Sequence, residues 1–249
     1  MAPSSFVTAD HVELHARHWH HTRTPRATVV IAHGFTASTE SAELVILAEA
    51  LHEHGLDITT YDARGHGRSG GMSTLGDLEQ HDVAAAVAHA RARSPKVVLV
   101  GASMGAIAVL RYAASDDTIA GLVTVSCPAQ WRLPRNARAV FAALLTRTSP
   151  GRRVAAKYLG VSIAPRWTNP EPPVSLARRV RVPFAIVHGD RDSFIPASAA
   201  RELYDAAPEP KHLEVVPTLT HAFQPAAVEP VVDAVEWTLH HRHPATLHE

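Results

Sequence analysis

The chain has 249 residues, of which 46% are hydrophobic and 19% are charged, and its 24 basic and 24 acidic side chains give a formal net charge of zero. These values are typical of a globular protein and exclude a disordered or a membrane-spanning chain. The single cysteine, Cys127, excludes an internal disulfide, and residues 1–10 have neither a basic start nor a long apolar segment. Since no linker or repeat divides the sequence, we expect one domain over residues 1–249, and cytoplasmic residence.

Strand and helix patterns alternate along the chain. Residues 12–17 alternate apolar and polar side chains, which predicts an edge strand with one wet face. Short apolar runs predict further strands over residues 27–32, 56–61, 97–100, 121–126, 183–188 and 212–216. Apolar residues at helical spacing and stop signals predict helices over residues 40–54, 77–93 and 197–207. This alternation predicts a parallel sheet, which places ligands at the carboxyl ends of its strands.

The strand over 97–100 runs into Gly101-Ala102-Ser103-Met104-Gly105, and a helix follows. The two glycines let strand and helix approach without Cβ clashes, while the sharp turn forces Ser103 into a strained backbone conformation. The Ser103 Oγ is then exposed at the carboxyl edge of the sheet, where the first amides of the helix also point. The Met104 N–H can stabilise an oxyanion there, so Ser103 is a candidate nucleophile.

This pentapeptide resembles the nucleophile elbow of the α/β-hydrolase superfamily, and the likeness to serine esterases and monoacylglycerol-lipase-like hydrolases spans nearly the whole chain. The resemblance implies the α/β-hydrolase fold, a mostly parallel twisted sheet flanked by helices. It also implies that His33-Gly34-Phe35-Thr36 is the oxyanion loop, with the Phe35 N–H as the second donor.

The loop from Asp62 to Gly71 is also familiar in this superfamily. Its glycines permit tight turns, and we expect Asp62, Arg64 and Ser69 to hydrogen-bond one another. The interpretation is a scaffold for the active site rather than a direct part in the chemistry.

The superfamily's order of nucleophile, acid and histidine places the acid after the strand over 183–188. Residues 189–196 have the form Gly-x-x-Asp-x-x-x-Pro, so by resemblance Asp192 is the acid and Asp190 shapes the loop by accepting backbone hydrogen bonds. The preceding strand ends in Ser126-Cys127-Pro128, which offers no carboxylate.

The histidine should follow one further helix and strand, and His221 does so, 29 residues after Asp192 (221 − 192). Its rivals belong to loops that would need a different chain order: His33, His66 and His188. In this hypothesis His221 removes the Ser103 proton, Asp192 orients the imidazole, and an acyl-enzyme forms that water releases.

Residues 127–182 break the rhythm of strand and helix and occupy the place where this superfamily inserts a cap. An apolar helical stripe is predicted from Val140, Phe141, Leu144 and Leu145. Irregular chain near the pocket mouth is predicted from Trp167, Pro170, Pro172 and Pro173. Substrate choice should depend on this cap, whose walls suit a lipid-like acyl group.

The cap is strongly basic. Residues 127–181 contain ten arginines and Lys157 against the single acid Glu171, or about +10 (11 − 1), so the remainder carries about −10. This charge either steers anionic substrates or docks the apolar stripe on anionic lipid, or it pairs with the acidic main domain. Peripheral membrane contact therefore stays open. The sequence leaves the oligomeric state open as well.

The predicted function is a serine hydrolase that cleaves a carboxylic ester or thioester bond of a small to medium acyl or lipid-like substrate. Other chemistries of the same three residues, C–C bond hydrolysis and perhydrolysis, stay open, as does a receptor-like binding protein. We expect no cofactor, no metal and no nucleic-acid partner. The clusters His18, His20, His21 and His240, His241, His243 lack carboxylates or cysteines at metal spacing, and Cys127 is interpreted as a small buried residue.

Overall fold

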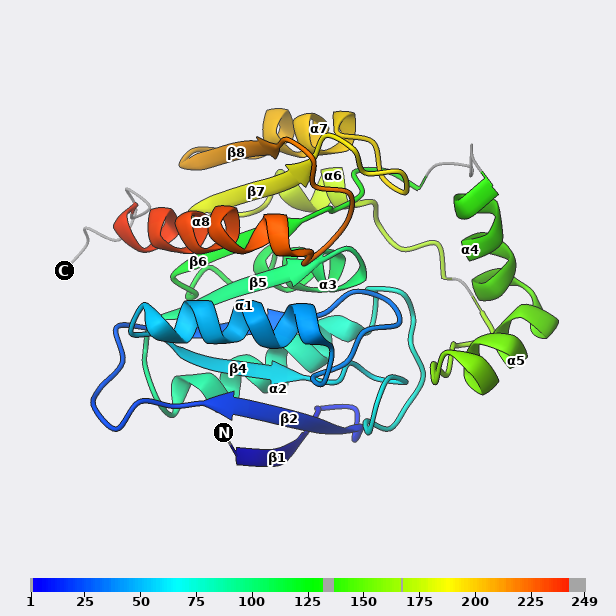
Figure 1. The fold of residues 1–249 in the computed structure, drawn as a ribbon, viewed down its shortest axis with the longest axis horizontal. Helices are drawn as coiled ribbons and strands as arrows, with labels where there is room; N and C mark the ends of the chain where they lie inside the picture. The colour runs from blue at the N-terminus through cyan, green and yellow to red at the C-terminus, as the bar shows by residue number, and fades with distance from the viewer. Residues whose placement is uncertain (1, 132–136, 167, 242–249) are drawn as a thin grey trace.

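The computed structural model describes residues 2–131, 137–166 and 168–241 and contains one eight-stranded sheet (Figure 1). The strand order is β1-β2-β4-β3-β5-β6-β7-β8. β1 and β2 run antiparallel to their neighbours, and the pairs from β4 to β8 are parallel. The strands are β1 (Ala2–Val7), β2 (Glu13–Trp19), β3 (Thr28–Ala32), β4 (Asp57–Tyr61), β5 (Val97–Ala102), β6 (Gly121–Val125), β7 (Phe184–Gly189) and β8 (Lys211–Val216).

Eight helices are described around this sheet. They are α1 (Ala42–Glu53), α2 (Glu79–Arg91), α3 (Met104–Ala113), α4 (Ala137–Arg147), α5 (Ser149–Tyr158), α6 (Pro173–Ala177), α7 (Ser198–Ala206) and α8 (Val228–His240), with a short 3₁₀ turn at Pro225–Ala227. The predicted parallel sheet and the alternation of strand and helix are thus confirmed.

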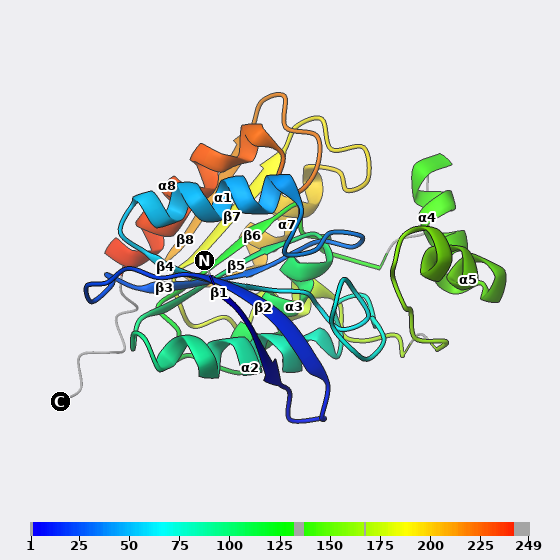
Figure 2. The ribbon, with the colours of Figure 1, turned by 60° about the horizontal axis from the view of Figure 1, so that its bottom comes forward.

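The core has two layers because successive residues of a strand face opposite sides of the sheet. In β5, Val97 and Leu99 pack on the face covered by α2, α3, α6 and α7, whereas Val98 and Val100 pack on the face covered by α1 and α8. Figure 2 shows these two layers above and below the sheet. Every residue of β3 to β7 is buried, as expected for strands covered on both faces.

The strand predicted over 12–17 is not at the edge of the sheet. β2 alternates as expected, with Leu14 and Ala16 fully buried, but β1 pairs with it along its whole length and forms the edge. The prediction was wrong because a half-buried alternating pattern reports one wet face of a strand and not whether its backbone has a neighbour.

The helices α4 and α5 stand beyond the carboxyl ends of the parallel strands, away from the other helices (Figures 1 and 2). They lie between β6 and β7 in the chain, inside the segment 127–182. The turn between them is fixed by Thr148, whose hydroxyl caps α5 by accepting a hydrogen bond from the Gly151 N–H at 3.0 Å.

Candidate active site

Ser103 joins β5 to α3 in a conformation that few non-glycine residues adopt. Its φ and ψ angles are 53° and −110°, so the predicted backbone strain is present. The flanking glycines are required because, as predicted, a Cβ at either position would clash with the neighbouring chain. A Cβ on Gly101 would lie 2.5 Å from the Gly105 oxygen, and one on Gly105 would lie 2.2 Å from the Ala32 oxygen. The close crossing of strand and helix therefore holds the Ser103 side chain at the sheet edge.

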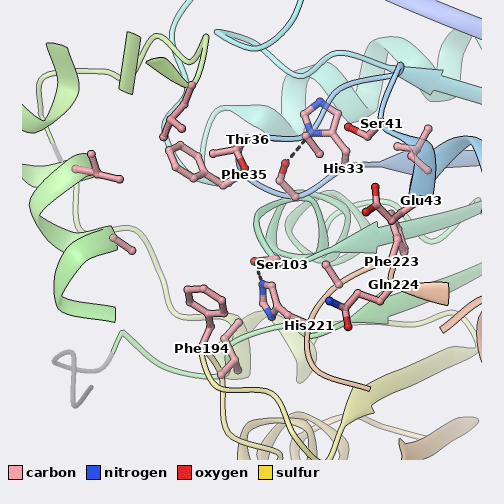
Figure 3. A pocket seen from close by; sticks show the side chains of 18 of the residues that line it. His33, Phe35, Thr36, Ser41, Glu43, Ser103, Phe194, His221, Phe223 and Gln224 are labelled. Atoms are coloured by element: carbon pink, nitrogen blue, oxygen red, sulfur yellow. Dashed lines mark hydrogen bonds between the residues drawn. The ribbon is translucent and has the colours of Figure 1, made fainter. Parts of the chain in front are cut away.

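The structure brings Ser103, His221 and Asp192 together. The Ser103 Oγ lies 3.1 Å from His221 Nε2 (Figure 3). His221 Nδ1 lies 2.7 Å from Asp192 Oδ2. The carboxylate can only accept, so Nδ1 carries the proton and Nε2 is free to accept the serine proton. This arrangement can deprotonate Ser103 and stabilise the resulting imidazolium.

The Asp192 carboxylate is completely buried. Burial opposes its ionisation, but the hydrogen bonds from His221 and from the backbone N–H groups of Ile195 and Phe194 outweigh burial and hold the Asp192 pKa below its usual range. Asp190 instead accepts a hydrogen bond from the Thr218 N–H at 2.8 Å. Of the two aspartates in this loop, the structure places Asp192 against the histidine.

The loop after β3 lies against the serine turn, because a Cβ on Gly34 would be 3.5 Å from the Ser103 Cβ. Among the described residues, neither the Phe35 N–H nor the Met104 N–H has a hydrogen-bond acceptor in the fold. The loop is held by His33, whose Nε2 accepts from the Ala63 N–H at 2.9 Å and whose Nδ1 donates to the Gly34 oxygen at 2.8 Å. Both candidate oxyanion donors are therefore available to a ligand beside Ser103.

A cavity of about 940 Å³ opens in front of Ser103 and His221. One wall is apolar and includes Leu145 and Leu159 from the α4–α5 region and Phe194 from the loop after β7. On the side away from the green ribbon of α4, Figure 3 shows Ser41, Glu43 and Gln224. Glu43 is the one carboxylate among the described residues that line the cavity. The site therefore has an apolar half on the α4 side and an opposite half that carries these polar groups beside Phe223, with the serine between them.

The predicted mutual hydrogen bonds of the Asp62 loop are only partly present. Ser69 Oγ donates to the Asp62 backbone oxygen at 2.6 Å, but Arg64 pairs elsewhere, with the buried Asp82 at 2.8 Å and with Asp10 at 2.7 Å. Arg64 is a buried cation, so it needs full charge compensation, which Asp62 and Ser69 do not supply. None of the predicted trio lines the cavity.

Several other predicted features lie away from the site. Pro170, Pro172 and Pro173 do not line the cavity, and Pro173 begins α6 instead; Trp167 lies outside the described residues. Cys127 is buried, and burial raises the pKa of its thiol well above the usual range. In the part of the chain that the structure describes, no group of three or more His, Cys, Asp or Glu side chains could hold a metal ion, and His243 falls outside it.

Two residues next to the proposed triad were not predicted. Ser126 has a positive φ of 50° at the end of β6, and its Oγ accepts a hydrogen bond from the Ala222 N–H, next to His221, at 3.1 Å. His188, considered only as a rival base, is buried with its Nε2 3.7 Å from Asp192 Oδ2. The same nitrogen donates to the Ile195 oxygen at 2.9 Å. Ser126 and His188 both lie at the ends of predicted strands, and this position is the sequence signal that could have indicated them.

Comparison with known proteins identifies the family and the fold of this chain. The family model described as "Serine aminopeptidase, S33" matches residues 23–170. The chain is 28% identical to the monoacylglycerol lipase of Mycolicibacterium smegmatis, over 87% of this chain and 89% of that protein. Its fold is similar to that of the Pyrococcus furiosus esterase Pf2001, with a TM-score of 0.76 and 21% identity over 97% of this chain and 91% of that chain.

A second similar structure is Est1E from Butyrivibrio proteoclasticus, solved with ferulic acid, with a TM-score of 0.69 and 23% identity over 95% of this chain and 98% of that chain. These likenesses confirm the predicted α/β-hydrolase fold. Within the described ranges, none of the helices is long and apolar enough to cross a bilayer.

Proposed function

The chain belongs to the serine aminopeptidase S33 family, and from this premise we propose that it is a serine hydrolase that cleaves carboxylic esters or thioesters of lipid-like acyl groups. The observation that carries the proposal is the pair of hydrogen bonds that links Ser103, His221 and Asp192 beside a largely apolar cavity.

In the first step His221 Nε2 takes the proton of Ser103 while Oγ attacks the ester carbonyl carbon. Asp192 stabilises the imidazolium, and the N–H groups of Phe35 and Met104 donate to the oxyanion. Collapse of the tetrahedral intermediate breaks the C–O bond, and the alcohol leaves with the proton from His221. Water, deprotonated by the same imidazole, then attacks the acyl-enzyme carbonyl. The acyl C–Oγ bond breaks, His221 returns the proton to Ser103 Oγ, and the acid is released.

The two halves of the cavity suggest how an ester would lie. The acyl chain would pack on Leu145, Leu159 and Phe194, and the alcohol part would lie near Glu43 and Gln224, which can hydrogen-bond hydroxyl groups. A neutral, hydroxyl-bearing alcohol such as a glycerol fits these groups better than an anionic one, because Glu43 repels negative charge. The similarity to a monoacylglycerol lipase supports this substrate class.

We further propose that residues 127–182 act as a cap on a single domain over 1–249. Phe141, Ala142 and Leu145 of α4 line the cavity, so this helix would limit acyl chain length. Phe141 is also 61% exposed and Leu144 is 54% exposed, which gives α4 an apolar outer surface beside the cavity. Peripheral contact with a lipid surface would bring a poorly soluble ester to this side.

Glu43 also favours a second candidate function, removal of an amino-terminal residue from a peptide. A carboxylate in the cavity wall could hold a substrate ammonium group, and the same serine chemistry cleaves amides. The large apolar wall favours the ester. Parallel assays of neutral acyl esters and amino-acid amides distinguish the two, since an aminopeptidase would prefer the amides.

The proposal is tested by Ser103→Ala, with Ser41→Ala as the matched control because Ser41 lines the same cavity. Fluorophosphonate should label the wild type and the control but not Ser103→Ala, and ester hydrolysis should fall by roughly 10⁴-fold or more in Ser103→Ala alone. A chain-length series of esters then measures the acyl half of the cavity. A Ser103→Ala protein with a near-normal rate would exclude the mechanism, and a wild type with no labelling and no turnover would favour a binding protein.

A further inference from the structure

A second, smaller cavity of about 160 Å³ lies where the α4–α5 segment meets the main domain. Its floor includes Ser73 and Thr74, which follow the glycine-rich loop after β4. Three arginines line it, from three different segments. Arg147 is in the last turn of α4, Arg152 is in the first turn of α5, and Arg166 lies in the chain that follows α5. This cavity shares no lining residue with the one at Ser103.

Among the described residues, these arginines have no acidic partner. Over residues 2–131, 137–166 and 168–241, no carboxylate lies within ion-pair distance of any of the three. Arg152 donates to the Ser149 hydroxyl at 3.1 Å. Arg147 and Arg166 are exposed and have no hydrogen-bond acceptor in the described fold. The first turn of α5 also lacks an acidic residue, so the positive end of that helix adds to the charge.

The carboxylate that holds the floor of this cavity is already satisfied. Glu79 is buried and accepts hydrogen bonds from the Ser73 hydroxyl, the Thr74 N–H and hydroxyl, and the Gly76 N–H, all between 2.6 and 2.9 Å. Its lone pairs are therefore directed at the loop and not at the arginines. Three like charges that line one small cavity repel each other, and an anion bound between them would relieve this repulsion.

We propose that Arg147, Arg152 and Arg166 form a binding site for a phosphate group, either free or in a lipid headgroup. Guanidinium groups offer paired N–H donors that match phosphate oxygens, and a tetrahedral phosphate can accept from three directions, whereas a planar carboxylate presents two oxygens. The hydroxyls of Thr74 and Thr146 are engaged in the fold, so recognition rests on the three arginines. The small volume favours a compact anion.

The site lies at a junction between cap and main domain that is already hydrogen-bonded. The Ser73 N–H donates to the Ser162 oxygen at 2.8 Å, and the Ala164 N–H donates to the Ser73 oxygen at 2.9 Å. A bound phosphate would add contacts from α4 and α5 to this junction. Since α4 also lines the cavity at Ser103 through Leu145, phosphate would stabilise the cap in the position seen here.

The test measures the binding of inorganic phosphate by calorimetric titration and by the shift of Tm. Sodium chloride at matched ionic strength is the reference. The double variant Arg147→Gln/Arg166→Gln is compared with Arg153→Gln/Arg178→Gln, which removes the same charge from exposed arginines that line neither cavity. We expect the first pair to weaken phosphate binding by about tenfold or more, which corresponds to about 1.4 kcal/mol or more, because charge-assisted hydrogen bonds are lost. We expect the second pair to leave phosphate binding unchanged. Equal Tm in the absence of phosphate shows that both variants fold.

Vesicles of phosphatidylcholine, with and without phosphatidic acid, separate the two sources of phosphate. Sedimentation with the phosphatidic acid vesicles that is lost in Arg147→Gln/Arg166→Gln alone assigns the site to a lipid headgroup; phosphate binding without such sedimentation assigns it to a free phosphate. The proposal is overturned if phosphate raises Tm no more than chloride does, or if both double variants weaken binding equally.

Discussion

His33 holds the peptide unit that presents the Phe35 N–H, and the variant His33→Phe isolates this role. The Ala63 N–H can only donate, so His33 Nε2 must be unprotonated and Nδ1–H must donate to the Gly34 oxygen. That oxygen and the Phe35 N–H belong to one planar peptide unit, so they turn together. Burial, and the neighbouring His66, lower the His33 pKa to about 4, which keeps this neutral tautomer at neutral pH. Phenylalanine keeps the buried ring and removes both hydrogen bonds.

The size of the effect follows from the contacts. Complete loss of one oxyanion donor lowers kcat by about 10²- to 10³-fold. The Gly34 oxygen keeps one other hydrogen bond, from the Ala37 N–H at 3.2 Å, so the peptide is loosened and not released. We therefore expect kcat to fall by about 10- to 100-fold with little change in KM, because the oxyanion exists only in the transition state. The unpaired Ala63 N–H should also lower stability by about 1–3 kcal/mol.

The assay is steady-state hydrolysis of an acyl ester together with urea unfolding. His66→Phe is the matched control, because His66 is equally buried and hydrogen-bonds the Arg64 oxygen and not the oxyanion loop. Phenylalanine there keeps an aromatic ring for the contacts with His33, at 5.2 Å between ring centroids, and with Phe35, at 5.7 Å. This control should lose stability and keep kcat. A His33→Phe enzyme whose kcat stays within about threefold of wild type would refute the reasoning, as would an equal loss of kcat in the control.

Three further predictions concern the acid, a strand-end serine and pH. Asp192→Asn should lower kcat by roughly 10³- to 10⁴-fold because the amide no longer fixes the orientation of the imidazole, whereas Asp190→Asn should mainly lower stability. Kinetics and melting curves of both variants test this, and the reverse pattern would make Asp190 the acid. Ser126→Ala removes the acceptor of the Ala222 N–H and should lower kcat by about tenfold with a smaller change in KM, while an unchanged kcat would restrict Ser126 to packing. Burial, with the nearby imidazoles, lowers the His18 pKa from 6.5 to about 4, so the unfolded chain binds a proton in this interval that the folded chain does not. Stability present above pH 6.5 should therefore be lost towards pH 4, by about 3 kcal/mol at most from this group. Urea midpoints across this range should fall less steeply in His18→Gln, and parallel curves would contradict the assignment.

The residues of the proposed triad could be predicted because topology fixes where they lie. Parallel strands end at one edge of the sheet, and Ser103, Asp192 and His221 each follow such a strand. Ser103 and His221 are 118 residues apart in sequence, yet the strand order makes them neighbours. The order of the three residues along the chain distinguished His221 from the other histidines. A local sequence pattern around each histidine would not have been sufficient to do so.

Contacts between distant segments could not be predicted in this way. The hydrogen bond between Ser126 and Ala222 joins residues 96 positions apart, and nothing near either residue in the sequence indicates it. Pairing of β1 with β2 depends on backbone groups that carry no side-chain signal. α8 was not predicted either, although Val228, Val231, Val232 and Val235 recur at helical spacing.

The positions of the charges argue that the cap and the ester cavity serve different ligands. For an anionic ester, steering by the cap arginines and repulsion by Glu43 at the reaction site would oppose each other. For a neutral ester they do not conflict, because Glu43 can then hydrogen-bond the alcohol part while the acyl chain packs on the apolar wall. Arg147, Arg152 and Arg166 line the other cavity, where no carboxylate among the described lining residues competes for them. These three of the cap's ten arginines are therefore better explained by the anion proposed at its junction with the main domain than by a charge on the substrate.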